Sequence, residues 1–146
     1  MANTYSQIDD IMRALYECIS GPPDGQDWAR ERTLYHNDAL ITRTRVEEGQ
    51  HVAYTFDIEG FIAATKPMLA GRSFYEIETA RKTQRFGQIA HVFSAYEARE
   101  TPGSNDIVFR GINMVHLWND GLRWWIMSII WDNEREGVSI PAHWFD

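Results

Sequence analysis

Residues 122–131 read LRWWIMSIIW, and they constrain the fold more than any other part of the chain. They contain three of the six tryptophans, and nearly every position is apolar. An Asn-Asp-Gly turn precedes them at 119–121, and a charged group follows at 132–135. This length, with β-branched and aromatic residues throughout, indicates a strand that is covered on both faces. One face can pack on helices of the same chain, whereas the other needs a second covering surface.

The composition and charge of the chain disfavour several classes of protein. With 146 residues, of which 44% are hydrophobic and 24% charged, we expect one globular domain over residues 1–146. A net charge of −7 disfavours nucleic acid and membrane partners, because both bind basic surfaces. No apolar run approaches the ~20 residues that span a bilayer, and no signal-peptide pattern is present. Cys18 is the only cysteine, which predicts a reducing, cytoplasmic location and a filler role in a helix.

Helical patterns fill the first half of the chain, and strand patterns fill the second. Helices are predicted over residues 4–19, 27–35 and 56–69, with a short strand over 38–44. After Gly71, four runs with strand character cover residues 74–85, 86–99, 107–118 and 123–131. Helices followed by an antiparallel meander are typical of an α+β fold, in which a curved sheet wraps over the helices. We expect the tail, residues 136–146, to lie back along the surface.

Two segments and one short step carry a resemblance to a known family. The segments RFGQIAHVFSAYEAR (85–99) and DGLRWWIMSIIWDNE (120–134), with the Asn-Asp-Ala step at 37–39, resemble the nuclear transport factor 2-like (NTF2-like) superfamily. They are most similar to its uncharacterised SnoaL-like, ketosteroid isomerase-like branch. The resemblance covers nearly the whole chain. It implies a cystatin-like cone, in which N-terminal helices pack in the concave face of a strongly bent antiparallel sheet and leave a pocket.

The same resemblance leaves the activity open. The superfamily includes ketosteroid isomerases, polyketide cyclases, dehydratases, non-catalytic binding modules and small subunits of ring-hydroxylating oxygenases, so fold does not choose among them. Ketosteroid isomerases use a tyrosine in the first helix, a position that falls near Ala14 and close to Tyr16. Their aspartate base falls near Arg43, and an arginine does not become a free base at neutral pH. The isomerase mechanism is therefore unsupported by the residues present.

Other residues are candidates for acid–base chemistry. His91 or His116 would carry protons if its strand turned it into the cone, and would lie in a subunit interface if it pointed outward. Asp38 and Tyr16 are the candidate supporting groups. A pair formed by His36 and Asp38 would orient a water molecule, although an ordinary polar loop explains the same two residues. The function predicted from these residues is a cyclase, isomerase or dehydratase that acts on a small apolar metabolite.

The expected ligand site is an apolar pocket without a metal or cofactor. Aromatic or polar residues on the helical half could line its mouth, although plain core packing explains each of them equally well: Trp28, Tyr35, His36, Tyr54 and Phe56. The sequence contains no HxH or HExxH spacing and no glycine-rich phosphate loop, so neither a metal nor a cofactor is predicted. The alternative function is a non-catalytic binding or assembly module, including a small oxygenase subunit.

Alternation along the last strand predicts a partner. Simple two-residue periodicity places one set of large apolar side chains on a single face: Trp125, Met127, Ile129 and Trp131. A monomeric cone covers only its concave side, and monomers rarely leave so large an apolar patch in water. We therefore expect a homodimer through the convex face of the sheet.

Overall fold

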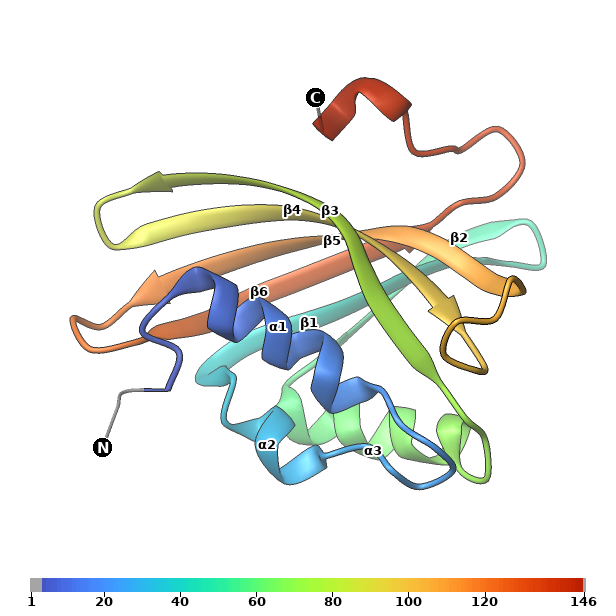
Figure 1. The fold of residues 1–146 in the computed structure, drawn as a ribbon, viewed down its shortest axis with the longest axis horizontal. Helices are drawn as coiled ribbons and strands as arrows, with labels where there is room; N and C mark the ends of the chain where they lie inside the picture. The colour runs from blue at the N-terminus through green and yellow to red at the C-terminus, as the bar shows by residue number, and fades with distance from the viewer. Residues whose placement is uncertain (1–3, 146) are drawn as a thin grey trace.

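A computed structural model describes residues 4–145, which form three α-helices and one six-stranded sheet (Figure 1). The helices are α1 (Ile8–Ile19), α2 (Trp28–Arg32) and α3 (Ile58–Leu69). The strands are β1 (Tyr35–Glu47), β2 (Gln50–Phe56), β3 (Tyr75–Phe86), β4 (Ile89–Arg99), β5 (Ile107–Asn119) and β6 (Trp124–Asn133). A short 3-10 helix covers Ala142–Phe145. Among the described residues, no helix is long and apolar enough to span a membrane.

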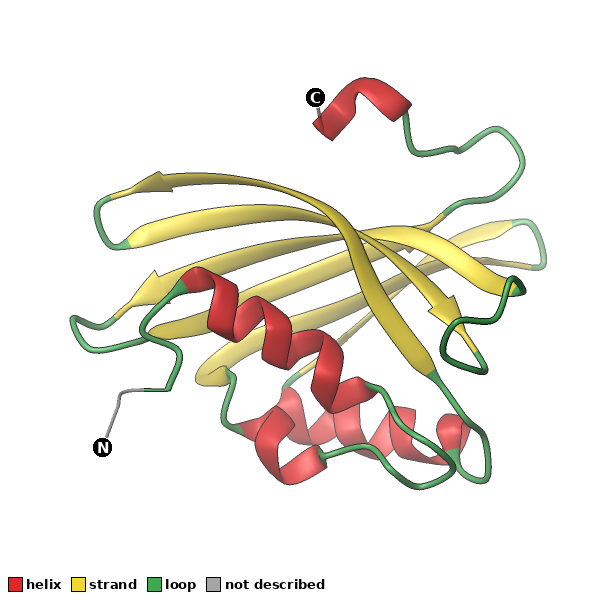
Figure 2. Ribbon diagram, viewed as in Figure 1, coloured by secondary structure: helices red, strands yellow, loops and turns green. Residues whose placement is uncertain are grey.

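The sheet has the order β2-β1-β6-β5-β4-β3 and is open at both edges. Neighbouring strands are antiparallel except β1 and β6, which run parallel. The sheet bends strongly, and all three α-helices lie on its concave side (Figure 2). The predicted α+β arrangement, with N-terminal helices inside a bent sheet, is therefore confirmed.

One strand was not predicted, and another is longer than predicted. Strand β1 begins at Tyr35, where a helix was expected to end, and it continues to Glu47. It then turns into β2 through Glu48 and Gly49, which both have positive φ angles (49° and 77°). Two consecutive positive φ angles are typical of a tight hairpin turn. Strand β2 is a largely exposed edge strand, so it lacks the alternation of apolar residues by which strands are predicted.

The core lies between the apolar face of α1 and the concave face of the sheet. Ile11 and Met12 are fully buried in the same cluster as Val92, Val115 and Trp124. Cys18 is also fully buried, and burial raises the pKa of its thiol to about 12. The thiol therefore stays protonated at neutral pH and fills space in the core, as predicted.

A bulge in β6 reverses the side-chain alternation expected for this strand. The pairing partners of His116 and Leu117 are Ser128 and Ile126, so Met127 is an additional residue in β6. An inserted residue shifts every following side chain to the opposite face. The prediction that Trp125, Met127, Ile129 and Trp131 share the convex face is therefore wrong. Ile129 is buried in the core, and Trp131 turns inward to meet the ring of Phe61 edge-on at 6.0 Å.

The C-terminal segment lies over the convex side of the sheet (Figure 1). The ring of Phe93 on β4 contacts those of Trp144 and Phe145, with centroids 5.3 Å and 6.0 Å apart. The expected return of the tail along the surface is confirmed for this segment. It covers only part of the convex face.

Candidate functional site

A cavity of about 330 Å³ lies inside the cone, between the helices and the concave face of the sheet. All three helices and every strand except β2 contribute to its wall. Much of the lining is apolar or aromatic: Leu15, Ile19, Phe61, Phe74, Phe109, Ile129 and Trp131. A cavity of this size with a few polar groups is the usual form of a small-molecule site.

The first polar group in the cavity is the carboxyl of Glu31. The capping hydrogen bond from the Arg30 amide to Asp27 Oδ1 (3.0 Å) starts the single turn of α2, which places Glu31 inward. Glu31 is only 1% exposed. Its Oε1 accepts a hydrogen bond from the Tyr35 hydroxyl at 3.3 Å, whereas Oε2 has no hydrogen-bond partner among the described residues. Burial raises the pKa of Glu31 to about 8, and the hydrogen bond from Tyr35 opposes this in part.

The second polar group is Glu76, near the start of β3. Hydrogen bonds between the Ser20 hydroxyl and the Glu76 backbone, 2.9 Å to the amide and 3.3 Å to the carbonyl, fasten this part of β3 to the end of α1. Burial raises the pKa of Glu76 to about 7, and a hydrogen bond from Asn113 lowers it in part. Within residues 4–145, neither Glu31 nor Glu76 forms an ion pair. Both carboxyl groups therefore exchange protons near neutral pH.

Arg43 brings a positive charge to the cavity from β1. Its Nη2 donates to the Thr65 hydroxyl at 2.9 Å, and its Nη1 donates to the Met68 sulfur at 3.3 Å. The guanidinium carbon lies 5.9 Å from the centre of the Trp131 ring. Burial and the nearby Arg45 lower the pKa of Arg43, but arginine titrates so far above neutrality that the charge remains.

A directed chain of hydrogen bonds runs from the cavity wall to the protein surface. The amide nitrogen of Asn113 donates to the Tyr16 hydroxyl at 3.0 Å, and this hydroxyl lies 2.6 Å from the Ser94 hydroxyl. Ser94 donates its single hydrogen to Glu78. Tyr16 must then donate to Ser94, so the whole chain points toward Glu78. Burial raises the pKa of Tyr16, which keeps its hydroxyl protonated.

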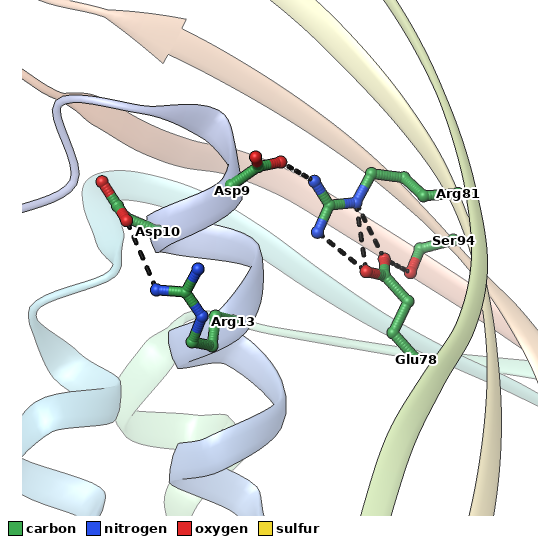
Figure 3. A network of polar contacts seen from close by, with 6 residues as sticks. All are labelled: Asp9, Asp10, Arg13, Glu78, Arg81 and Ser94. Carbon is green, nitrogen blue, oxygen red and sulfur yellow. Dashed lines mark hydrogen bonds and ion pairs between the residues drawn. The ribbon is translucent and has the colours of Figure 1, made fainter.

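The outer end of this chain is an ion-pair cluster between α1 and β3 (Figure 3). Arg81 contacts Glu78 at 2.8 Å and also pairs with Asp9 on α1. Both oxygens of Glu78 accept hydrogen bonds, from the Arg81 guanidinium and from the Ser94 hydroxyl, so Glu78 is the acceptor at which the chain ends. This fixes the amide nitrogen of Asn113 toward Tyr16, and thereby fixes how Asn113 is presented to the cavity.

Comparison with known proteins identifies the fold. No sequence profile of a known family matches this chain, and no curated protein is similar to it in sequence. The beta subunit of a putative aromatic-ring-hydroxylating dioxygenase from Novosphingobium aromaticivorans superposes with a TM-score of 0.67 at 16% identity, over 93% of this chain and 91% of that one. An NTF2-like protein of unknown function from Shewanella baltica gives a TM-score of 0.58 at 15% identity, over 86% and 91%. The protein has the NTF2-like fold.

Another solved structure with the same fold is an enzyme. Hexachlorocyclohexane dehydrochlorinase LinA-type3 from Novosphingobium barchaimii superposes with a TM-score of 0.65 at 12% identity, over 92% of both chains. At such low identity the likeness extends to the fold alone. The chemistry of this protein has to be argued from its own cavity.

The NTF2-like cone places the two candidate histidines outside the cavity. His91 and His116 pair across β4 and β5, and their rings stack 6.3 Å apart on the exposed convex face. The inward positions beside them belong to Val92 and Val115, which are buried in the core. Of the two orientations considered for each histidine, the outward one is observed. Neither reaches the cavity, so the candidate role of His91 or His116 as a proton carrier there is contradicted.

The candidate pair His36 and Asp38 also lies outside. The Asp38 amide donates to His36 Nδ1 at 3.1 Å, and the Asp38 side chain is 88% exposed. The ring of His36 packs edge-on against Trp118 and Trp125, at 5.7 Å and 6.2 Å. His36 and Asp38 alternate with Tyr35 and Ala39, which are buried in the core, so both point away from the cavity.

Of the aromatic residues predicted to bind a ligand, only Tyr35 lines the cavity. Trp28 and Phe56 pack against the core instead. Tyr54 lies on the exposed edge strand β2, where its hydroxyl donates to Glu47 at 2.8 Å. Tyr16 lies in the wall behind Asn113, with its hydroxyl 3.0 Å from that amide.

The groups that sequence reasoning missed are mainly carboxylates. Residues 74–85 were predicted only as a strand, with no role for their carboxylates, whereas Glu76 and Glu78 turn toward the interior. Two carboxylates spaced two positions apart on one strand face were the available signal. Glu31, within the charged run WARER, gave no comparable signal. Within residues 4–145, no cluster of His, Cys, Asp and Glu is arranged to hold a metal ion.

Proposed function

We propose that the protein is a small enzyme that binds an apolar metabolite in the cone cavity and performs acid–base chemistry with its own carboxyl groups. One observation carries the proposal. Glu31 and Glu76 both line one largely apolar cavity, and neither has a cationic partner among the described residues. Structural carboxylates are usually paired with cations, whereas catalytic ones are held where their pKa lies near the working pH.

The two carboxyl groups suit different roles. With a pKa of about 7, Glu76 is substantially ionised at neutral pH and can accept a proton from a carbon next to a carbonyl group. With a pKa of about 8, Glu31 is mostly protonated and can donate a hydrogen bond to the carbonyl oxygen as charge develops there. Returning the proton to a different atom completes an isomerisation, and loss of a leaving group completes an elimination. Two titratable groups with separated pKa values are the usual arrangement for such chemistry.

Similar folds support both this proposal and one alternative. The dehydrochlorinase of the same fold is an elimination enzyme by name, which favours a catalytic cavity. The dioxygenase beta subunit favours an assembly module that works with a larger chain. A cavity of about 330 Å³ with two unpaired carboxyl groups supports the first, since a pure assembly module has no use for either.

Hydrogen exchange at carbon tests the proposed enzyme. A panel of ring ketones and α,β-unsaturated carbonyl compounds is incubated with the protein in D2O, and deuterium uptake next to the carbonyl is followed by NMR. We expect the wild type to catalyse this exchange. Glu76→Gln should lower the exchange rate about 100-fold, because the variant lacks the general base. Glu59→Gln is the matched control, since Glu59 is 63% exposed and pairs with Arg32 outside the cavity. Equal exchange by the wild type and Glu76→Gln would overturn the assignment, and no exchange with any compound would favour the assembly module.

We also propose that two copies pair through the convex face. Of the side chains predicted to form this interface, Trp125 and Met127 remain available, whereas Ile129 and Trp131 face inward. Several large apolar side chains on this face extend the patch and are left to solvent by the single chain: Met114 (48% exposed), Trp118 (37%) and Ile130 (44%). Continuous apolar patches of this kind mark association surfaces.

A further inference from the structure

We infer that the ligand of the cone cavity is an apolar compound that carries a carboxylate group, and that Arg43 is the residue that selects it. This inference rests on the proposed use of the cavity as a small-molecule site. It adds the chemical class of the ligand and a specificity-determining residue.

The first argument is the unbalanced charge of Arg43. Among the described residues, no carboxylate lies within ion-pair distance of its guanidinium. The other two arginines that line the cavity are paired, Arg45 with Glu47 and Arg72 with Glu100 at 3.9 Å. A partly buried charge without a counterion costs free energy, which a bound anion would recover.

The second argument is the unused hydrogen-bonding capacity of the same group. A guanidinium has five N–H donors, and the Thr65 hydroxyl and the Met68 sulfur accept only two of them. Sulfur is a weak acceptor and a hydroxyl is neutral, so neither compensates the charge. The donors of a guanidinium are spaced to bind both oxygens of one carboxylate, which a lysine cannot do.

The third argument is the distribution of charge over the cavity wall. Three arginines line it although the chain as a whole carries a charge of −7. Arg45 and Arg72 are each paired with a glutamate, so the positive charge of the wall that has no ion-pair partner among the described residues is that of Arg43. Neither Glu31 nor Glu76 lies within ion-pair distance of Arg43, and Glu31, with a pKa raised to about 8 by burial, is mostly protonated at neutral pH.

The body of the ligand is defined by the residues between these charged groups. Trp131 lies beside Arg43, Phe61 meets Trp131 edge-on at 6.0 Å, and Ile129 is the next inward residue on β6. This surface suits a ring system. Arg43 follows Tyr35 by eight positions on β1, so the guanidinium and the Tyr35–Glu31 pair enter the cavity at separate points. A carboxylate held at Arg43 therefore leaves the rest of the molecule free to reach the acid–base groups.

The test compares two probes of nearly equal shape, 2-naphthoate and its neutral amide 2-naphthamide, by isothermal titration calorimetry on the whole chain. We expect the wild type to bind 2-naphthoate at least about tenfold more tightly than 2-naphthamide, because a charge-assisted bidentate pair contributes that much. Arg43→Gln should remove this preference while leaving the affinity for 2-naphthamide within about twofold. Arg43→Lys should retain only part of the preference.

Arg110→Gln is the matched control. This substitution also removes one arginine charge, but Arg110 pairs with Glu97 at 3.0 Å and does not line the cavity. We expect the Arg110→Gln variant to bind both probes with the affinities of the wild type. The inference is overturned if the wild type binds the two probes equally, if it binds neither up to 1 mM, or if Arg43→Gln keeps the preference. The comparison on the wild type remains informative even if the Arg43 variants fold poorly. If the probes bind equally while exchange still depends on Glu76, this inference fails and the proposed enzyme stands.

Discussion

Glu31 shows how strongly the surroundings of one residue can change its chemistry. The carboxyl is fully enclosed, its only hydrogen bond among the described residues comes from Tyr35, and its pKa rises from 4.5 to about 8. The unfolded chain ionises this carboxyl more readily than the native state does. The contribution of Glu31 to the free energy of unfolding is therefore fully present below about pH 4.5. It is lost as the pH rises through the native-state pKa of about 8.

We predict that Glu31→Gln removes this loss. At pH 9 the variant should be more stable than the wild type by on the order of 4 kcal/mol, and below pH 4.5 the two should be nearly equal. Urea unfolding at a series of pH values measures the difference. Glu76 produces a dependence of the same sign below about pH 7 in both proteins, so the difference curve isolates Glu31. Parallel curves for the two proteins would contradict the raised pKa.

Asn113 shows a second effect at the residue scale, which is orientation. Its amide nitrogen faces Tyr16 because the hydrogen bonds beyond it all point toward Glu78, which accepts from both Ser94 and Arg81. Tyr16 and Ser94 are 78 positions apart in the chain, and no local pattern relates them. Their role follows only from the arrangement of α1 across β4 and β5.

At the scale of elements, Gly111 determines how closely β4, β5 and β6 approach one another. A Cβ atom at this position would collide with the Tyr96 hydroxyl, the Asp132 carbonyl oxygen and the Asn133 side-chain oxygen. The Tyr96 hydroxyl also donates a hydrogen bond to Asn133 here. Only glycine, which has no Cβ atom, therefore fits at this position between β4 and β6, beside the cavity.

We predict that Gly111→Ala lowers the free energy of unfolding by about 2–3 kcal/mol, since overpacking a rigid site costs this much. Chemical denaturation measures the loss. Tyr96→Phe removes one of the three colliding groups, so the double variant should lose less than the sum of the two single variants. Strict additivity would show that the Tyr96 hydroxyl does not limit the space at Gly111.

The bulge in β6 is the other feature decided at this scale. By adding Met127 to the strand, it turns Ile129 and Trp131 inward, where both line the cavity. A regular strand would have turned the same two residues toward the convex face. One extra residue therefore changes the composition of both the candidate ligand site and the candidate interface.

At the scale of the whole molecule, the convex face predicts association. We expect light scattering at micromolar concentration to give twice the 17.0 kDa mass of the chain. Ile130→Lys, at a side chain that is 44% exposed on this face, should shift the mass to that of the monomer without unfolding it. Leu122→Lys is the control, because this 73% exposed residue lies in the turn before β6. A monomeric wild type, or a dimer unaffected by Ile130→Lys, would contradict the proposed interface.

The sequence by itself determined the class of fold, the three helical segments and the four strands after Gly71. Each of these depends on the periodicity of apolar residues, which is a local property. The NTF2-like fold was also predicted from the sequence, and the similarity to solved structures of this fold confirms it.

Only the tertiary structure decided the candidate site. Periodicity says that residues share a face, but not which face is concave, and a single bulge reverses the assignment. The tertiary structure excluded His91 and His116 from the cavity. It brought Glu31, Glu76 and Arg43 into the cavity from three separate elements. The pKa values of the two carboxyl groups depend on burial by residues distant in the chain, because desolvation is a property of the folded surroundings rather than of the neighbouring sequence.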